Sequence, residues 1–212
     1  MGLNSFLEDM SSKGLYFLYG EAASGKTTII KIACIDKIKK GKRVLFIDAE
    51  KGFSIDRFKQ LAGDNYKDYL KNLLLIKVNS FKDQQIKIKN LEDFIKKQDI
   101  SLIALDTISY YYRTLFKSKP DLAKAMLISQ LKILKAISKK IPVLITSQVY
   151  EDIKKNKIKA VAYDLIDNYP DVIIRLEKNP RTFIKERPKS EKVTFEIVDQ
   201  GILGSFAIIL SS

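Results

Sequence analysis

The chain has 212 residues, of which 46% are hydrophobic, 10% aromatic and 30% charged. This balance excludes a disordered, collagen-like or membrane-embedded protein, and the length predicts one compact domain over residues 1–212. Lys and Arg outnumber Asp and Glu by 38 to 25, and the resulting net charge of +13 favours a polyanionic partner, with nucleic acid the first candidate.

The chain contains a single cysteine, Cys34, and no histidine. One cysteine cannot form an internal disulfide, which fits the reducing cytoplasm. The absence of histidine excludes Ser-His-Asp and Cys-His nucleophile pairs and His-ligated zinc, so catalysis would depend on carboxylates, lysine, hydroxyls or a carboxylate-bound metal. No apolar run reaches the roughly 18 residues of a membrane-spanning helix. We therefore expect a soluble cytoplasmic protein.

Apolar periodicity predicts strands that alternate with helices. Short continuous apolar runs indicate strands buried on both faces, and apolar residues at helical spacing indicate amphipathic helices. In chain order the predicted elements are a strand at 15–19, a helix at 26–39, a strand at 44–47, a helix at 55–62, a strand at 73–78, a long helix from 80 to about 97, a strand at 101–105, a helix at 123–139, a strand at 143–146, a short helix at 162–168 and a strand at 172–177. This alternation predicts a mostly parallel, twisted sheet covered by helices on both faces.

The pattern changes after residue 178. Apolar runs at 182–184, 193–198 and 206–210 are separated by turn residues and leave no room for helices. They predict an antiparallel β-meander at one edge of the sheet. The expected fold class is therefore α/β, with a C-terminal antiparallel meander added to a parallel sheet.

Residues 20–27, GEAASGKT, match the phosphate-loop (Walker A) pattern G-x-x-x-x-G-K-[ST] between a predicted strand and a predicted helix. Glycines let successive backbone amides point inward around an anion, and the helix N-terminus adds positive potential. Lys26 would reach the β- and γ-phosphates of ATP, and the Thr27 hydroxyl would bind Mg²⁺. The alternative is a chance match, against which the flanking strand and helix argue. The predicted nucleotide-binding residues are Gly20, Glu21, Ala22, Ala23, Ser24, Gly25, Lys26, Thr27 and Thr28.

Two acidic residues follow buried strands. Asp106 closes the apolar run Leu102–Leu105, where a phosphate-loop protein needs a second carboxylate for Mg²⁺. The alternative for Asp106 is a strand-end acid that caps the next turn. Glu50 follows the strand at 44–47, and with no histidine available it is the natural general base for an attacking water.

Further segments follow the phosphate loop in a fixed order. They are FIDAE at 46–50, DTIS at 106–109, ITSQVY at 145–150, DVIIRLEK at 171–178, KERP at 185–188 and VTFEIVDQGI at 193–202. Together they resemble the RecA/RadA recombinase core, and most closely its archaeal RadB branch. The resemblance covers nearly the whole chain and implies a RecA-like P-loop NTPase fold. It implies a single ATPase core domain without a separate N-terminal DNA-binding domain.

The resemblance also implies residue roles. Glu50 matches the catalytic glutamate, and Gln148 matches a glutamine that contacts the γ-phosphate and links nucleotide state to a DNA-binding loop. The expected catalytic residues are thus Glu50, Lys26 and Gln148, although Gln148 could instead be an ordinary polar residue at a strand end. Lys185 and Arg187 match cations that reach the phosphates of a neighbouring subunit, the alternative being solvated hairpin charges. Between them this chain has Glu186, where RadB-like chains often have histidine.

Two DNA-binding loops are implied at about residues 112–121 and 151–160. The first follows three tyrosines at 110–112, so aromatic and basic groups adjoin, as single-strand binders need for stacking and phosphate contact. The tyrosine run could instead be a packing element. The second lacks the Gly-Gly that is common in the family. The DNA-binding candidates are Arg113, Lys117 and Lys119 in the first loop, and Lys154, Lys155, Lys157 and Lys159 in the second.

Three functions remain open from the sequence. The leading hypothesis is a RadB-like recombination and repair accessory protein that binds ATP, Mg²⁺ and DNA, hydrolyses ATP weakly and assists a full RadA-type recombinase. The second is a nucleotide-gated protein- or DNA-binding module with little or no hydrolysis. The third is a small P-loop kinase, which should carry an arginine-bearing lid over the donor phosphates; the six scattered arginines and the terminal antiparallel meander argue against it. Self-association into a homo-oligomer is compatible with each, and none requires a membrane.

Overall fold

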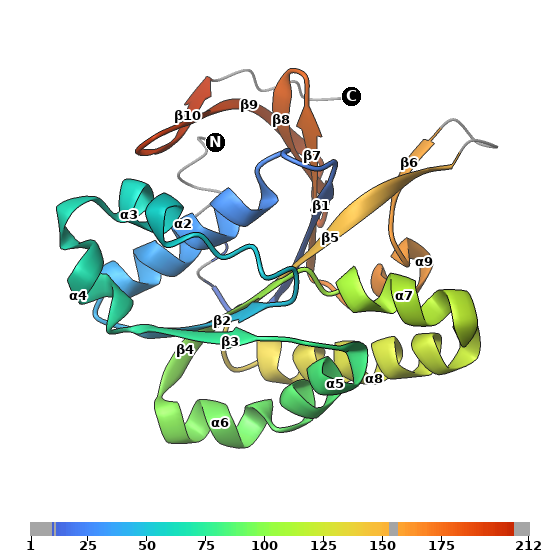
Figure 1. Ribbon diagram of the computed structural model, residues 1–212. Helices are drawn as coiled ribbons and strands as arrows, with labels where there is room; N and C mark the ends of the chain where they lie inside the picture. Colours follow the sequence, from blue (N-terminus) through green and yellow to red (C-terminus); the bar gives the residue numbers. More distant parts are fainter. Residues whose placement is uncertain (1–9, 11, 153–156, 206–212) are drawn as a thin grey trace.

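The computed structural model describes residue 10, residues 12–152 and residues 157–205. Within these ranges ten strands form one sheet in the order β10-β9-β8-β7-β1-β5-β4-β2-β3, with β6 paired to β5 (Figure 1). The strands are β1 (Leu15–Gly20), β2 (Arg43–Asp48), β3 (Leu73–Lys77), β4 (Ile100–Asp106), β5 (Val143–Asp152), β6 (Lys157–Ala160), β7 (Val172–Lys178), β8 (Arg181–Arg187), β9 (Glu191–Val198) and β10 (Gly201–Ser205). Six of them, β7, β1, β5, β4, β2 and β3, run parallel. The structure confirms the predicted fold class.

Helices cover both faces of the parallel part (Figure 1). They are α2 (Lys26–Lys39), α3 (Ile55–Ala62), α4 (Tyr66–Leu70), α5 (Phe81–Lys89), α6 (Leu91–Gln98), α7 (Tyr110–Ser118), α8 (Pro120–Ser138) and α9 (Tyr163–Ile166), and a 3₁₀ turn (Gly63–Asn65) precedes α4. Among the helices of the described ranges, none combines the length and the apolar character that crossing a bilayer requires.

Alternating side chains of the central strand β1 belong to two separate cores. Leu15 and Phe17 pack in the core that α5 to α9 close, whereas Tyr16 and Leu18 pack in the core that α2 and α3 close. Because β1 is buried on both faces, its sequence is a continuous apolar run rather than an alternating one. Because β1 is a central strand, the segment that follows Gly20 begins at the middle of the carboxyl-terminal edge of the sheet.

Two helical predictions need correction. The helix expected from 80 to 97 is divided at Asn90, which caps the end of α5 and the start of α6. Asparagine competes for backbone hydrogen bonds and favours helix ends, so the apolar periodicity concealed this break. The helix expected at Ala123 begins earlier, at Pro120, whose fixed φ suits a first helical position.

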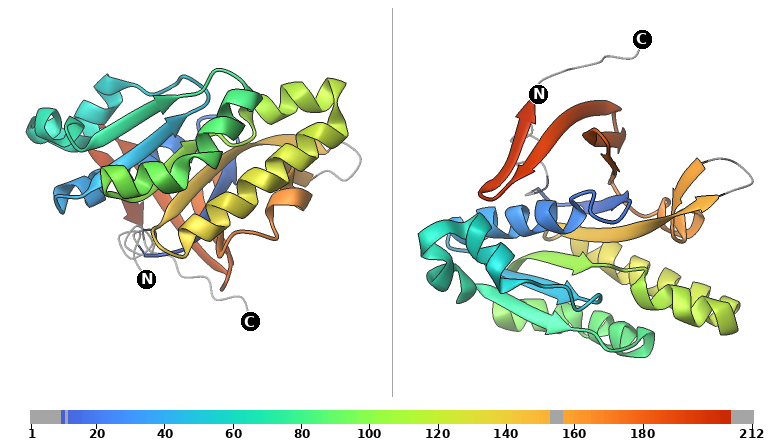
Figure 2. Two further views of the ribbon diagram at one scale, coloured as in Figure 1. Left: turned by 90° about the horizontal axis from the view of Figure 1, so that it is seen from below. Right: turned by 45° about the horizontal axis from the view of Figure 1, so that its top comes forward.

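The C-terminal meander bends over the N-terminal end of α2 (Figure 2). A β-carbon placed on Gly25 would lie only 2.9 Å from Cδ1 of Ile197 in β9. From α3, the Arg57 guanidinium donates to the carbonyls of Val198 at 2.9 Å and Asp199 at 3.1 Å. The last predicted strand, 206–210, lies outside the described residues, and β10 occupies 201–205 instead.

Replacement of Phe183 tests whether the meander packs in the core that α2 and α3 close. Phe183 is 0% exposed, whereas Leu203 on β10 is 61% exposed. We expect Phe183→Ala to lower the free energy of unfolding by about 3 to 5 kcal/mol, because it removes a buried ring and leaves a cavity. Urea unfolding measures this, with Leu203→Ala as the control expected within about 0.5 kcal/mol of wild type. Equal losses in both variants would contradict a shared core.

Candidate nucleotide and nucleic-acid site

The polar residues identified in the sequence meet at the carboxyl-terminal edge of the parallel strands. Gly20 at the end of β1 is in register with Gln148 of β5, and Asp48 at the end of β2 is in register with Asp106 of β4. The backbone amide of Ala49 donates to the Asp106 carbonyl at 2.8 Å, which carries the chain past this edge. Ligands of open α/β sheets bind at such an edge.

The phosphate loop fits tightly between β7 and α2. A β-carbon on Gly20 would lie 2.3 Å from the carbonyl oxygen of Leu176, and Gly25 has a φ of 107°, a left-handed conformation that favours glycine. The Ser24 hydroxyl oxygen is buried and has no hydrogen-bond partner in the described part of the chain. A phosphate oxygen would supply the missing partner, so the loop residues fit a nucleotide phosphate.

The Lys26 ammonium lies across this loop. Its Nζ donates to the carbonyl oxygens of Gly20 at 2.9 Å and Glu21 at 2.7 Å. Burial lowers the pKa of Lys26, while the nearby Asp106 and Glu50 oppose that shift by stabilising the ammonium. A cation held by two neutral carbonyls would gain a stronger, charge-assisted partner from a phosphate.

Asp106 is held in one orientation by hydroxyl groups. The Thr27 hydroxyl donates to Oδ2 at 2.6 Å, and the Thr146 hydroxyl donates to Oδ1 at 2.5 Å. Asp106 is only 7% exposed. The two residues assigned to Mg²⁺ from the sequence, Thr27 and Asp106, are therefore in direct contact, and their hard oxygen atoms suit that ion. The Thr107 hydroxyl also donates to Oδ1, at 3.3 Å.

Glu50, Gln148 and Arg113 form a hydrogen-bonded chain across the same edge. The Gln148 amide nitrogen Nε2 donates to Oε1 of Glu50 at 3.0 Å. On the other side, Nη1 of Arg113 donates to Oε1 of Gln148 at 2.9 Å. The structure thus joins the expected catalytic glutamate to a DNA-binding candidate on α7 through the expected linking glutamine.

Two buried charges at this edge were missed in the sequence. The Asp48 carboxylate accepts from the backbone amides of Gly52 at 3.1 Å and Phe53 at 2.9 Å, and so holds the turn that follows Glu50. Lys31 of α2 lies beneath that turn, with Nζ 4.7 Å from the Phe53 ring centre, and burial lowers its pKa. The acid within FIDAE was a signal for Asp48. Lys31 occupies an apolar helical face, so only the fold reveals its position.

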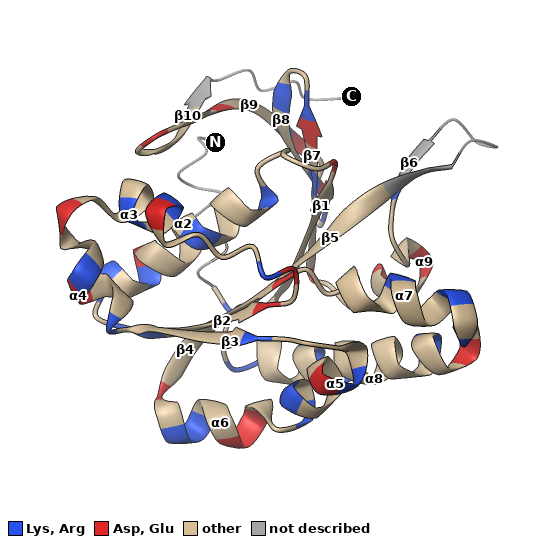
Figure 3. Cartoon of the chain, viewed as in Figure 1, with Lys and Arg blue, Asp and Glu red and all other residues tan. Residues whose placement is uncertain are grey.

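The first segment predicted to bind DNA is helical rather than a loop. Residues 110–118 form α7, and Pro120 begins α8, so Arg113 and Lys117 lie on a helix and Lys119 between two helices. Figure 3 shows Lys and Arg positions on α7. Tyr112 is buried, and the Tyr111 hydroxyl donates to the Val78 carbonyl. The packing interpretation therefore holds for two of the three tyrosines, and Tyr110 is exposed.

The second segment predicted to bind DNA is a β-hairpin over the described residues. Strands β5 and β6 pair antiparallel, and this pairing places the backbone of Lys157 opposite Asp152. Lys154 and Lys155 lie outside the described residues. The Lys159 ammonium lies 3.4 Å from the Asp164 carboxylate, an exposed pair that leaves Lys159 able to exchange partners.

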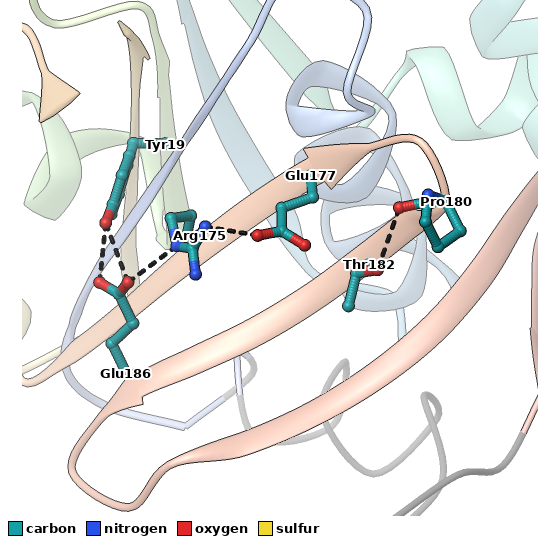
Figure 4. Close-up of polar contacts among 6 residues, drawn as sticks. All are labelled: Tyr19, Arg175, Glu177, Pro180, Thr182 and Glu186. Atoms are coloured by element: carbon teal, nitrogen blue, oxygen red, sulfur yellow. Dashed lines mark hydrogen bonds and ion pairs between the residues drawn. The ribbon is translucent and has the colours of Figure 1, made fainter. Parts of the chain in front are cut away.

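The β8 cations make contacts within their own chain. Lys185 is 9% exposed and lines a cavity of about 140 Å³ with Met10 and Tyr16. Arg187 is exposed, and its guanidinium donates to the Asp167 carbonyl at 2.6 Å. Glu186, on the opposite face of β8, accepts from the Tyr19 hydroxyl at 2.9 Å and from Nε of Arg175 at 3.0 Å (Figure 4). Glu186 therefore anchors β8 to β1 through Tyr19 and to β7 through Arg175.

A phosphate loop after the central strand of a mostly parallel sheet, with carboxylates at the ends of the adjoining strands, defines the RecA-like class of P-loop NTPases. The sequence model of the Rad51 family matches residues 4–167. The chain belongs to the Rad51 family, in its RadB branch.

The relatives that place it in this branch are similar over most of their length. The "DNA repair and recombination protein RadB" of Methanococcoides burtonii is 33% identical over 196 residues, which cover 87% of this chain and 86% of the relative. The protein of the same name from Methanocaldococcus jannaschii is 34% identical over 211 residues, which cover 94% and 98%. A solved structure described as "Crystal structure of the RadB recombinase" has a TM-score of 0.77 and 31% identity, covering 91% of this chain and 90% of that one.

The Tyr19–Glu186 contact predicts a dependence of stability on alkaline pH. Burial, and then the Glu186 charge, raise the pKa of Tyr19 above its ordinary value of 10.0. Above that pH the unfolded phenol ionises while the folded one stays neutral, so the free energy of unfolding falls as pH rises, by at most about 1.4 kcal/mol per pH unit for this group. We expect Tyr19→Phe to show a shallower fall in urea unfolding between about pH 9 and pH 11. Identical slopes in both proteins would contradict the assignment.

Proposed function

We propose that the chain is a recombination and repair accessory protein that binds ATP with Mg²⁺, binds DNA, hydrolyses ATP weakly and assists a full RadA-type recombinase. The observation that carries this proposal is the 2.6 Å contact between the Thr27 hydroxyl and the Asp106 carboxylate beside Lys26. This contact supports the proposal because it brings together the two oxygen-bearing side chains that would bind Mg²⁺ beside the phosphate loop. The names of the relatives, which are DNA repair and recombination proteins, support the biological role.

The nucleotide phosphates would lie in the loop at residues 20–28. Backbone amides at the N-terminus of α2 would cradle them, and the Lys26 ammonium would exchange its two carbonyl acceptors for phosphate oxygens. Thr27 and Asp106 would hold Mg²⁺, which supplies charge neutralisation on the phosphate oxygens. The 2.6 Å distance between the Thr27 hydroxyl and Oδ2 of Asp106 favours this role for Asp106 over a purely turn-capping one.

Glu50 would orient the water that attacks the γ-phosphate. It is half-buried at the end of the FIDAE segment, and the turn behind it is fixed by the buried Asp48. A carboxylate in such a position can accept the proton of the attacking water as the new P–O bond forms. Gln148 donates a hydrogen bond to Glu50 at 3.0 Å, and from this position its side chain would turn to contact the γ-phosphate.

DNA would bind over α7 and the hairpin of β5 and β6. Arg113 and Lys117 on α7, Lys119 after it, and Lys159 on β6 supply phosphate partners, and Lys154, Lys155 and Lys157 belong to the same proposed surface. Tyr110 offers one exposed ring for base stacking. A cation acting on a neighbouring copy would be Arg187 rather than the buried Lys185, because Arg187 is exposed and bonds only neutral carbonyls in the described residues.

One observation favours a second candidate, a nucleotide-gated binding module with little hydrolysis. In this structure Glu50 already accepts a hydrogen bond from Gln148, which occupies one of the oxygens that would orient water. ATP would then act by strengthening the association of the protein with DNA or a recombinase.

Replacement of Glu50 separates the two candidates. We expect Glu50→Gln to lower the rate of ATP hydrolysis by about 100-fold or more, because it removes the general base but keeps the shape of the side chain. ATP affinity, measured by isothermal titration calorimetry, should stay within about threefold of wild type, since the phosphate contacts are intact. Full turnover in Glu50→Gln would rule out the assignment of the base. Negligible turnover in wild type, with DNA affinity raised by ATP, would establish the gated module.

A further inference from the structure

The Gln148 side chain is held at both ends. A primary amide has one accepting end and one donating end, and here Oε1 accepts from Arg113 while Nε2 donates to Glu50. The arginine therefore selects the amide orientation that suits the carboxylate. The opposite orientation would place Oε1 against the Glu50 carboxylate, where two acceptors would face each other.

Arg113 is open to a competing partner. Its guanidinium is exposed and, among the described residues, its hydrogen bond is to the neutral Gln148 oxygen. Arginine binds phosphate through paired, charge-assisted hydrogen bonds, which are roughly twice as strong as neutral ones. A phosphate that reached α7 would therefore outcompete Gln148 for this guanidinium.

The surface around Arg113 fits a nucleic-acid strand as the source of that phosphate. Tyr110, Arg113 and Lys117 are all exposed, and their spacing along α7 places them on one face of the helix. Such a face offers one ring for stacking and two cations for consecutive phosphates.

We propose that Arg113 is a positioning residue that holds Gln148 on Glu50, and that a DNA phosphate binding Arg113 releases both side chains. This inference rests on the proposed function, since it assigns Glu50 to hydrolysis and α7 to DNA. Release would free Glu50 to orient water and Gln148 to turn to the γ-phosphate. Linkage requires the reverse effect as well, so a nucleotide that draws Gln148 away would free Arg113 for DNA.

The kinetic test compares three full-length proteins: wild type, Arg113→Met and the control Thr114→Ala, a substitution at the next exposed position of α7. We expect Arg113→Met to raise DNA-free ATP hydrolysis by about three- to tenfold, the size of one hydrogen bond, and to abolish further stimulation by saturating oligothymidylate. Saturation is set by fluorescence anisotropy in each protein. Thr114→Ala should keep the wild-type basal rate and stimulation, and Arg113→Lys, which keeps the charge, should recover part of the stimulation.

An NMR experiment tests the positioning role of Arg113 without relying on ATP hydrolysis. The side-chain amide resonances of Gln148 in a ¹⁵N–¹H NMR spectrum should shift in wild type when oligothymidylate is added. In Arg113→Met they should lie near the DNA-bound position already, and addition of DNA should leave them there. Inorganic phosphate alone should produce the wild-type shift only weakly, because it lacks the neighbouring contacts on α7.

The outcomes distinguish the two proposals. If wild type hydrolyses no ATP with or without DNA, the proposed ATPase function fails, and the Gln148 resonances still decide the role of Arg113. If wild type hydrolyses ATP but saturating DNA neither raises the rate nor shifts the Gln148 resonances, the ATPase function stands and the release by DNA is wrong. If Arg113→Met lowers DNA affinity but keeps the wild-type basal rate, stimulation at saturation and Gln148 resonances, Arg113 is only a DNA contact and the positioning role is wrong.

Discussion

The hydrogen bond from the Thr27 hydroxyl to the Asp106 carboxylate joins the phosphate loop to the edge of the sheet, and the candidate site depends on it. Thr27 belongs to the first turn of α2, whereas Asp106 ends β4, so the 2.6 Å distance fixes the helix against the strand. The Thr146 hydroxyl holds the other carboxylate oxygen from β5. Three elements that are distant in sequence thereby share one buried carboxylate. A polar group that is so fully satisfied rigidifies its surroundings.

The parallel register extends this constraint to the remaining groups. Because parallel strands end at the same edge, Gln148 lies level with Gly20, and Asp48 lies level with Asp106. Glu50 then needs only the short turn held by Asp48 to reach Gln148. From there Arg113 continues the chain of contacts to the surface of α7. Two hydrogen bonds thus link the exposed basic helix α7 to Glu50, whose charge acts on the ammonium of Lys26 in the phosphate loop.

The sequence was most informative where the signal is local. Continuous apolar runs identified the buried strands, and the spacing of Gly20, Gly25 and Lys26 identified the loop, because both patterns are written in neighbouring residues. The division of α5 from α6 at Asn90 was missed, since apolar periodicity continues across it. Contacts between distant residues, such as Arg113 with Gln148 and Tyr19 with Glu186, have no local signal. They required the register of the sheet.

We propose that the phosphate loop and the basic surface on α7 and β6 are coupled through one sheet edge. The most direct measurement is the affinity for a fluorescent oligonucleotide with and without ATP and Mg²⁺, at two salt concentrations, for wild type and Lys26→Ala. We expect ATP to strengthen DNA binding in wild type but not in Lys26→Ala. We also expect the affinity to fall steeply with salt, by about 0.7 to 0.9 in log K per log salt for each phosphate neutralised. The same affinity with and without ATP, or one that barely changes with salt, would contradict this proposal.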